Sequence, residues 1–600
     1  MKKISVIPAL TLLLAIAFSC SEDFFDKRPL GATDETVFYN EKGINALMIG
    51  VYGGMTNAGW GASVAHWTYG SAASDDAYKG SEDTDQVPIN EIERWEVTVT
   101  NGYPSQMWNL TFGRGVHRAN EVLRIIDLTP DLAPDTRDRL IAEARFLRAL
   151  YYFQAWLVFG DRLPIITRDV ENPRLVSNVN PEGALLQFII SDLQFAWENL
   201  PESQPEPGRP TKFAAMGLAA RAYLQELKYA EAKPLLVAII ASGRYQLMTN
   251  FYDNYNIANN NNAESIFEFQ RAVNDGSSGS LNAEMGLGLN APHGSDIGMC
   301  CGFHQPSQNL VNAFRVDQDG LPMFNTFNNT DLKHDQGVPS SAVFVPFEDE
   351  VDPRLDWTVG RRGIPFLDWG INRGRDWIRD QSNGGPYMPA LKPFFRKEER
   401  YSLSTQSGWQ TGVNANNIRF LRLTHILLWG AEVAAFEGDL ELARNLVNLI
   451  RQRAGNQVVM GRVLIHELPP GVYPWGAGTD ASDFMSGGAV DWTRPAANYK
   501  IGLYPPFASQ AEAMRAVQWE QRLEFATEGM RFFDLRRWEK LPAGLNLMPM
   551  AQTLNDFQKG DMRIRTFMAG ANFTERDKYQ PIPQVQIDLQ PEVLKQNPGY

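Results

Sequence analysis

Cysteine is scarce in this sequence. Among 600 residues it occurs only as Cys20, Cys300 and Cys301. One of the three lies next to the N-terminal apolar segment, so no disulfide framework can hold the fold together. Cys300 and Cys301 are neighbours and leave two alternatives open. They form a vicinal disulfide in an oxidising compartment, or they are two free thiols in a loop.

Positive net charge and long hydrophobic runs are also missing. The formal charge of −14 argues against nucleic acid or an anionic membrane surface as the main partner. After the first 20 residues, no stretch is long and apolar enough to cross a bilayer. With 44% hydrophobic and 21% charged residues, the composition is that of a globular protein with ample material for a large core.

Common catalytic motifs are absent. The sequence contains no HExxH, no glycine-rich phosphate loop, no GxSxG and no paired CxxC. His293 and His304 flank Cys300 and Cys301, but adjacent thiols do not readily supply the separated ligands that zinc takes. We therefore predict no metal site and no cofactor.

The N-terminus has the pattern of an export signal. Lys2 and Lys3 precede an apolar core, Ile4 to Phe18, whose 15 residues fall short of the roughly 20 that a membrane-spanning helix needs. The segment ends in "AFSC", which resembles the lipobox of bacterial lipoproteins, although Phe18 is bulky for that position. We predict a signal peptide over 1–19 and lipidation of Cys20. The alternative is an unmodified cysteine near a conventional cleavage site.

Helical periodicity dominates much of the chain. Apolar residues recur at three- and four-residue spacing in seven segments. These are 104–128, 136–160, 182–200, 212–227, 229–243, 419–455 and 509–529. The first two predict a helical hairpin, with Gly160 as the stop. "AARAYLQELKYAEAKPLLVAI" and "AEVAAFEGDLELARNLVNLI" both place small residues at helix contacts, as in degenerate tetratricopeptide-like hairpins.

Two loop-rich segments interrupt these helices. Residues 244–416 and 456–507 are rich in Gly, Asn, Pro and aromatics, and only Glu264–Gln270 alternates like a short strand. Long irregular segments in a compact domain are usually functional. We predict one mainly α-helical domain over 20–600, with a helical scaffold at roughly 36–243, 417–455 and 509–540 that carries these two inserts.

Two groups of side chains are candidates for function. The first is tryptophan, which occurs fifteen times, often in Gly- or Pro-rich segments. Examples are Trp60, Trp67, Trp95, Trp357, Trp369, Trp377, Trp475 and Trp492. A flat indole can cover the C–H face of a sugar while neighbouring polar groups bond its hydroxyls. The second group is carboxylates. Glu520 and Glu524 lie among arginines and predict a structural ion-pair network, whereas Asp75 and Asp76 are either a solvated turn or a hydrolytic pair.

Several segments together resemble the SusD/RagB family of surface lipoproteins from Bacteroidetes. They include "CSEDFFDKRPLG", "AEARFLRALYYFQAWLVFGDRLPI", "AESIFEFQ", "WEQRLEFATEGMRFFDLRRW" and "YQPIPQVQIDLQPEVLKQNPGY". The resemblance implies a SusD-like helical fold with about four tetratricopeptide-like hairpins and a loop-rich binding region. It also implies a lipoprotein, anchored in the outer membrane and facing outward. Such a protein binds oligosaccharides without catalysis and passes them to a SusC-like TonB-dependent transporter.

The resemblance separates bracing residues from binding residues. Arg522, Glu524, Glu528, Arg531, Asp534 and Arg537 resemble the family's C-terminal bracing network. For ligand binding we predict stacking by Trp67, Tyr69 and Trp95, with Asp75, Asp76 and Lys79 as hydroxyl partners. Weaker candidates are Phe303, His304, Trp369 and Trp377. Two other functions remain as alternatives: a RagB-like peptide receptor, and a surface glycoside hydrolase that uses Asp75 and Asp76.

Overall fold

The computed structural model describes most of the chain after its N-terminal segment. The described residues are 34–600 without 57–58, 278–280, 285, 294–298, 390–391, 393, 404–411 and 465–489. The predicted signal peptide 1–19 and the predicted lipidation site Cys20 lie outside them. No described helix is both long and apolar enough to span a membrane.

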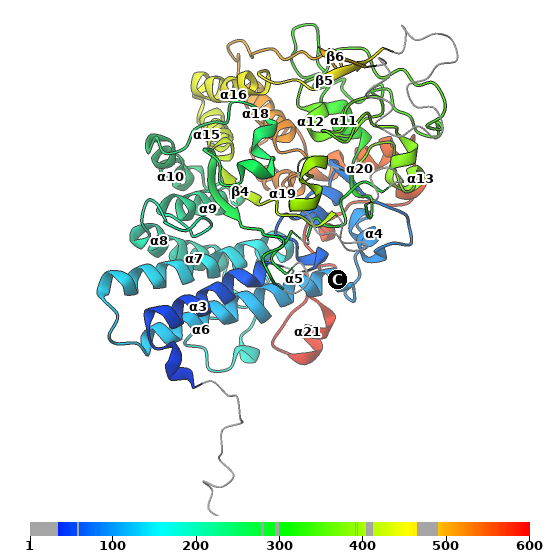
Figure 1. Ribbon diagram of the computed structural model, residues 1–600. Helices are drawn as coiled ribbons and strands as arrows, with labels where there is room; N and C mark the ends of the chain where they lie inside the picture. The colour runs from blue at the N-terminus through cyan, green and yellow to red at the C-terminus, as the bar shows by residue number, and fades with distance from the viewer. Residues whose placement is uncertain are drawn as a thin grey trace, which may run out of the picture.

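A ladder of helix pairs forms the larger part of the fold. Within the described residues, four contacting pairs follow one another. They are α3 (Glu41–Tyr52) with α6 (His117–Asp127), α7 (Pro134–Phe159) with α8 (Ala184–Asn199), α9 (Lys212–Gln225) with α10 (Tyr229–Ala241), and α15 (Leu423–Glu437) with α16 (Leu440–Ala454). Each pair also packs on the next, through α6 and α7, α8 and α9, and α10 and α15 (Figure 1). The mainly α fold with about four tetratricopeptide-like hairpins is confirmed.

The longest helix of the ladder is α7. Pro134 stands at its first position, where the missing N–H costs nothing, and Asp135 follows in the first turn. Every residue from Phe146 to Phe159 is buried, because α6 covers one side and α8 another. The helix stops at Gly160 (φ 69°), a backbone angle that favours glycine, as the sequence predicts.

The C-terminal helices close one side of this ladder. α18 (Gln510–Glu524) packs on α15 and α16, and α19 (Arg531–Trp538) and α20 (Met550–Asp561) follow it. The predicted helix over 509–529 extends five residues beyond the observed C-terminal end and one before its start. After Glu524 the chain turns through Thr527 (φ 64°) and Gly529 (φ 74°). Gly529 packs directly on the backbone oxygen of Ala65, where a Cβ would lie only 1.9 Å away.

The remaining chain makes short elements and long connections. The described residues form three two-stranded antiparallel sheets: β1 (Ala77–Gly80) with β3 (Phe303–Pro306), β2 (Ser265–Phe269) with β4 (Ile418–Arg422), and β5 (Met460–Val463) with β6 (Val490–Pro495). The strand predicted at Glu264–Gln270 is confirmed as β2. Residues 419–422, expected in a helix, belong to strand β4 instead, because β2 pairs with them from far away in the sequence, which periodicity cannot reveal.

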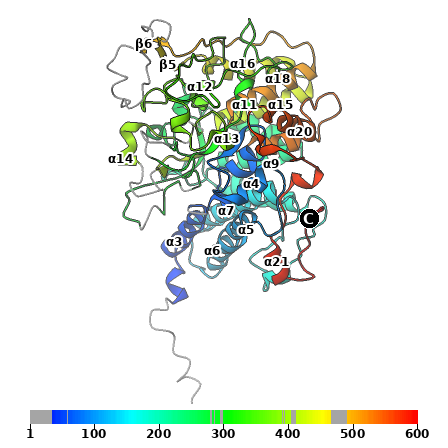
Figure 2. The same ribbon diagram turned by 90° about the vertical axis from the view of Figure 1, so that its right-hand side faces the viewer.

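The start of the helix ladder and the loop-rich part around β5 and β6 lie at opposite ends of the molecule. The N-terminal helices α3 and α6 lie at the lower end, and β5, β6 and the short helix α12 (Leu355–Thr358) lie at the upper end in both views (Figures 1 and 2). Three more short helices pack on other elements. α4 (Val87–Glu93) and α13 (Gln381–Gly384) contact β1, and α11 (Gln308–Ala313) contacts α20.

A network of buried ion pairs joins the ladder to the loop-rich part. Glu524 accepts from Arg354, Arg422 and Arg453, and the side chains of all four are at most 3% exposed. Glu520 pairs with Arg354 and Arg451, and Arg537 pairs with Glu432 and Asp534. The prediction that these C-terminal acids and arginines brace the fold is confirmed.

Candidate functional site

The residues predicted to bind ligand lie inside the protein. Each of the ten is at most 4% exposed. They are Trp67, Tyr69, Asp75, Asp76, Lys79, Trp95, Phe303, His304, Trp369 and Trp377. A ring without an exposed face cannot stack on a sugar, so the structure corrects the predicted stacking surface: in this arrangement these side chains are core.

The buried tryptophans serve as anchors between loops. The indole N–H of Trp67 donates to Gly286 O at 2.7 Å, that of Trp95 to Ala73 O at 2.9 Å, and that of Trp369 to Phe395 O at 2.9 Å. Each bond satisfies a buried N–H donor and joins two different segments of the chain. A tryptophan in a glycine-rich segment therefore marks a loop that other loops cover.

Asp75 and Asp76 are part of the bracing network. Arg531 donates to both carboxylate oxygens of Asp75, at 2.8 and 3.0 Å, and Arg522 lies 2.9 Å from the same carboxylate. Burial alone would raise the pKa of Asp75, but the two guanidinium groups lower it to about 2. Burial raises the pKa of Asp76 to about 6. Neither carboxylate reaches solvent, so the structure does not offer them as hydroxyl partners or as a hydrolytic pair.

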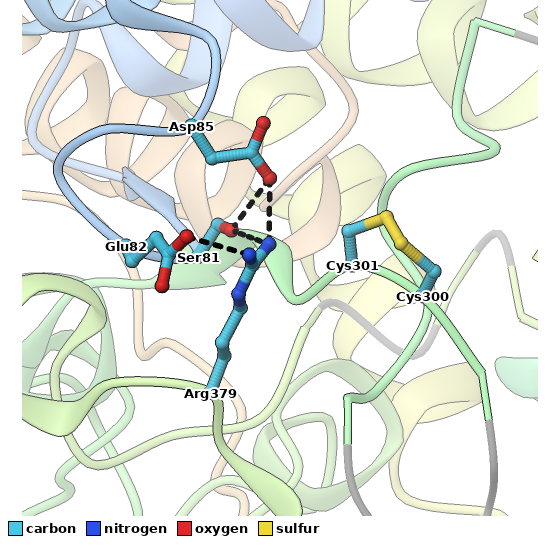
Figure 3. Close-up of a disulfide and its surroundings, with 6 residues drawn as sticks. All are labelled: Ser81, Glu82, Asp85, Cys300, Cys301 and Arg379. Carbon is cyan, nitrogen blue, oxygen red and sulfur yellow. Dashed lines mark hydrogen bonds and ion pairs between the residues drawn. A yellow bond between two sulfur atoms is a disulfide. The ribbon is translucent and has the colours of Figure 1, made fainter. Parts of the chain in front are cut away.

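Lys79 and the loop after β1 are also structural. The Lys79 ammonium donates to the backbone oxygens of Glu82 and Asp85, at 2.7 and 2.8 Å, and burial lowers its pKa to about 8. Arg379 holds the outside of the same loop, donating to Glu82 and Asp85 at 2.6 Å each and to Ser81 at 3.0 Å (Figure 3).

The vicinal cysteines lie beside this loop. The structure joins Cys300 and Cys301 as a disulfide, one of the two alternatives left open by the sequence (Figure 3). Gly302, the next residue, accepts a hydrogen bond from the backbone N–H of Ser81, so the disulfide lies directly next to the β1–β3 pair. Among the described residues, no three His, Cys, Asp or Glu side chains come together as a metal site would require.

An aromatic cleft opens instead at the upper end of the molecule, beside β5 and β6. It has an empty volume of about 430 Å³. Its walls are Asp356, Trp357, Pro365, Leu367, Arg396, Val459, Met460 and Trp492. Trp492, on β6, is 40% exposed, and Met460, on β5, is 39% exposed. This is the type of site that the tryptophan surplus predicts, but it is built from other residues.

Local geometry fixes both indoles of this cleft. Trp357 stands in α12, where its ring stacks on Tyr252 at 5.1 Å and 25°, and its N–H reaches Gln457 O at 3.3 Å. Trp492 lies over Gly461, where a Cβ would come within 2.7 Å of the ring. Gly461 (φ 116°) sits at the irregularity between Met460 and Arg462 in the β5–β6 register. The absence of a side chain there lets the indole lie flat against the strand.

The polar groups of the cleft differ in their freedom. The half-buried guanidinium of Arg396 makes no hydrogen bond or ion pair within the part of the chain that the structure describes, so its donors are available. Asp356 is fully engaged: Arg361 donates to both of its oxygens at 2.6 and 2.7 Å, and Tyr499 donates at 2.7 Å. The cleft thus combines two indoles, a guanidinium with no partner among the described residues, and a carboxylate that is paired with Arg361.

Sequence reasoning noted Trp357 and Trp492 but did not select them. Both occur among the loop tryptophans singled out above, and only burial distinguishes them from Trp67 or Trp95. The pattern "VDWTRP" gives no signal of this exposure, because alternation would place Trp492 on the same face as the buried Val490. Trp475, another of those tryptophans, lies outside the described residues.

Comparison with known proteins places the chain in a family. Residues 263–600, more than half of the chain, match the family described as "SusD family", and residues 23–224 match the description "Starch-binding associating with outer membrane". A "SusD-like protein" of Bacteroides ovatus is 29% identical over 292 residues, which is 45% of this chain. That match spans about half (49%) of the relative's own length.

Solved structures share the fold. A SusD-like protein from Bacteroides fragilis aligns with a TM-score of 0.65 at 21% identity, covering 95% of this chain and 99% of that one. Surface glycan-binding protein A from Bacteroides thetaiotaomicron, solved in complex with laminarihexaose, aligns with a TM-score of 0.60 at 19% identity, covering 93% and 99%. At such identities the likeness concerns the fold alone. The fold and the match over residues 263–600 agree, and the chain belongs to the SusD family.

Proposed function

We propose that this protein binds oligosaccharides in the aromatic cleft at β5 and β6 and delivers them, without catalysis, to a SusC-like TonB-dependent transporter. The observation that carries the proposal is the pair of indoles, Trp357 and Trp492, that line one cleft with the guanidinium of Arg396. Aromatic faces cover the C–H surface of a pyranose ring, and a guanidinium donates to its hydroxyls. The laminarihexaose complex of a protein with the same fold supports a glycan as the ligand class.

The carboxylates of the cleft favour binding over hydrolysis. Glycosidases commonly use two carboxyl groups, about 5–5.5 Å apart in retaining enzymes and about 6.5–9.5 Å in inverting ones. Asp356 is the one carboxylate among the described lining residues, and Arg361 and Tyr499 occupy both of its oxygens. The hydrolase alternative therefore loses its best candidates here as well as at Asp75 and Asp76.

The place of action follows from the proposed anchor. Lipidation of Cys20 would hold the protein permanently, since each buried methylene contributes about 0.8 kcal/mol and a lipoprotein cysteine carries more than one chain. The family description that matches residues 23–224 names association with the outer membrane. A tethered binder has no pore of its own, so import requires a transporter as partner.

The test is glycan binding by the Trp492→Ala variant. Because Trp492 is 40% exposed, its removal should leave folding intact and weaken binding of a recognised polysaccharide about tenfold, or about 1.4 kcal/mol. Affinity electrophoresis against a polysaccharide panel would measure this. The matched control is Trp197→Ala, a partly exposed tryptophan on α8 in the helix ladder, which should bind like the parent.

Three outcomes would contradict the proposal. Equal affinity in Trp492→Ala and the parent would remove the cleft as the site. Binding of peptides but of no glycan would favour the RagB-like alternative. Release of shortened sugars from a bound glycan by the purified protein would show an enzyme.

A further inference from the structure

A second cavity lies between the helix ladder and the loop-rich part, away from the aromatic cleft. It encloses an empty volume of about 790 Å³, including its opening to solvent. Parts of α9, β4 and the turn after α18 line it, together with residues 64–66. The wall is mixed: Val64, Leu287, Phe420 and Met530 are apolar, and many of the other lining residues are polar. The charged Glu284, Lys392 and Glu528 are paired with other side chains. One cation of the wall has no hydrogen bond or ion pair to the described residues.

That side chain is Arg221 of α9. It is 7% exposed, and its guanidinium lies between the rings of Phe153, 5.3 Å from the centroid, and Phe420, 4.8 Å from it. No hydrogen bond or ion pair joins Arg221 to any residue that the structure describes, and its Nε is fully buried without an acceptor. Asp534 and Glu528 act on it only through space, since Arg537 and Arg422 engage them.

Other buried arginines of this protein do have partners. Arg354, Arg422 and Arg537 each contact at least two carboxylates. Burying an unpaired cation is costly, because it loses hydration without gaining an anion. Two stacked rings compensate part of that cost but provide no acceptor for the N–H groups.

More unpartnered polar atoms line the same cavity. Thr527 Oγ1 and His66 Nδ1 are buried without a hydrogen-bond partner, and so is Arg419 Nε. Buried polar groups in native proteins are almost always bonded to protein or to a bound molecule. Several of them around one cavity, with the cation of Arg221 in its wall, indicate an occupant that carries oxygen atoms and negative charge.

We propose that this cavity binds a small carboxylate. The guanidinium of Arg221 presents parallel N–H groups that match the two oxygens of a carboxylate, and the Thr527 hydroxyl donates a further bond. The apolar wall formed by Val64, Leu287 and Met530 receives a short alkyl chain, which an inorganic anion lacks. The site is separate from the aromatic cleft and does not depend on the proposed glycan function.

Propionate is the probe that tests the proposal. At constant ionic strength, propionate should raise the melting temperature of the purified protein saturably and more than chloride or sulfate does. Isothermal titration should give one site, weakened at least tenfold in Arg221→Met and also weakened in Thr527→Val, which keeps the β-branched shape. The matched control is Arg515→Met. Arg515 also stacks on a ring, Phe324 at 5.9 Å, without a described ion pair, but it lies in another groove.

The outcomes separate clearly. Selective stabilisation by propionate that Arg221→Met removes and Arg515→Met retains supports the site. If Arg221→Met does not fold, Arg221→Lys and Thr527→Val decide by titration, since both keep the cavity's charge. Equal effects of propionate and chloride, or undiminished propionate binding in Thr527→Val and Arg221→Lys, would overturn it.

Discussion

The helix ladder and the loop-rich part are both buried, but different forces hold them. In α7, from Phe146 to Phe159, apolar side chains fill nearly every position, and neighbouring helices cover them. In the loop-rich part, residues such as Arg354, Asp352 and Lys392 are just as inaccessible, and ion pairs and bonds to backbone oxygens satisfy them.

This difference follows from the backbone. A helix satisfies its own N–H and C=O groups, so its buried side can be entirely apolar. An irregular segment leaves backbone groups unsatisfied, and buried side chains must supply the partners. Charged and aromatic residues in such segments therefore serve the interior first. They are accessible to a ligand only where the surface opens, as it does at Trp492.

The largest effect should come from removing a buried charge at the junction of the two parts. Arg354→Met leaves Asp352, Glu520 and Glu524 with less compensation in a water-free site, so the free energy of unfolding should fall by about 3–5 kcal/mol. Urea unfolding followed by circular dichroism measures it. As a control, Arg563→Met breaks the exposed pair with Asp331 and should cost less than about 1 kcal/mol. Equal losses in the two variants would deny that the buried network braces the fold.

A cavity in the helix ladder should have the next largest effect. Leu147, fully buried in α7, should lose about 2–5 kcal/mol of unfolding free energy on change to alanine, because apolar contacts disappear and a void remains. This loss should be the same at low and high salt, since no charge is involved. Leu175→Ala, at a position 71% exposed, is the control and should be neutral within about 0.5 kcal/mol. A salt-dependent loss in Leu147→Ala would contradict the view that apolar packing alone stabilises this part of α7.

The smallest effect concerns pH and a buried histidine of the loop-rich part. Burial lowers the pKa of His304 from 6.5 to about 3, so the folded protein keeps the ring neutral. Below pH 6.5 the unfolded chain takes up a proton that the folded chain refuses. Stability should therefore fall as pH decreases from 6.5 toward 3, by at most about 1.4 kcal/mol per pH unit from this residue.

His304→Gln should reduce that slope, measured by urea unfolding at pH 7.0 and 5.0. The exposed His117→Gln on α6 is the control and should keep the parent's slope. A slope in His304→Gln equal to that of the parent would mean that His304 does not contribute to acid sensitivity.

Much of the fold was predictable from local pattern. The helices of the ladder begin and end within a few residues of their apolar periodicity, and the strand at Glu264–Gln270 stands where alternation predicts it. The secondary-structure predictions fail where contact with a segment distant in sequence determines the local conformation. Residues 419–422 pair with β2, and the turn after α18 brings Gly529 against the backbone of Ala65.

The candidate site was predictable in kind but not in position. Tryptophans in loops indicated an aromatic platform, yet Trp67, Trp95 and Trp369 became anchors, whereas Trp492 stays exposed. Composition cannot distinguish these cases, because burial depends on which other loop lies above each ring. Likewise, Asp75 reads as a surface acid until Arg522 and Arg531 arrive from more than 440 residues away.

The sequence by itself determined the mainly helical architecture, the family resemblance and the bracing role of its C-terminal charges. These depend on short-range periodicity and on motif order, which the chain carries locally. Only the tertiary structure decided which aromatic rings face solvent, that Cys300 and Cys301 are joined, and that Arg221 lines a cavity with no hydrogen-bond or ion-pair partner among the described residues. The physical reason is that exposure and charge compensation are properties of contacts between distant segments.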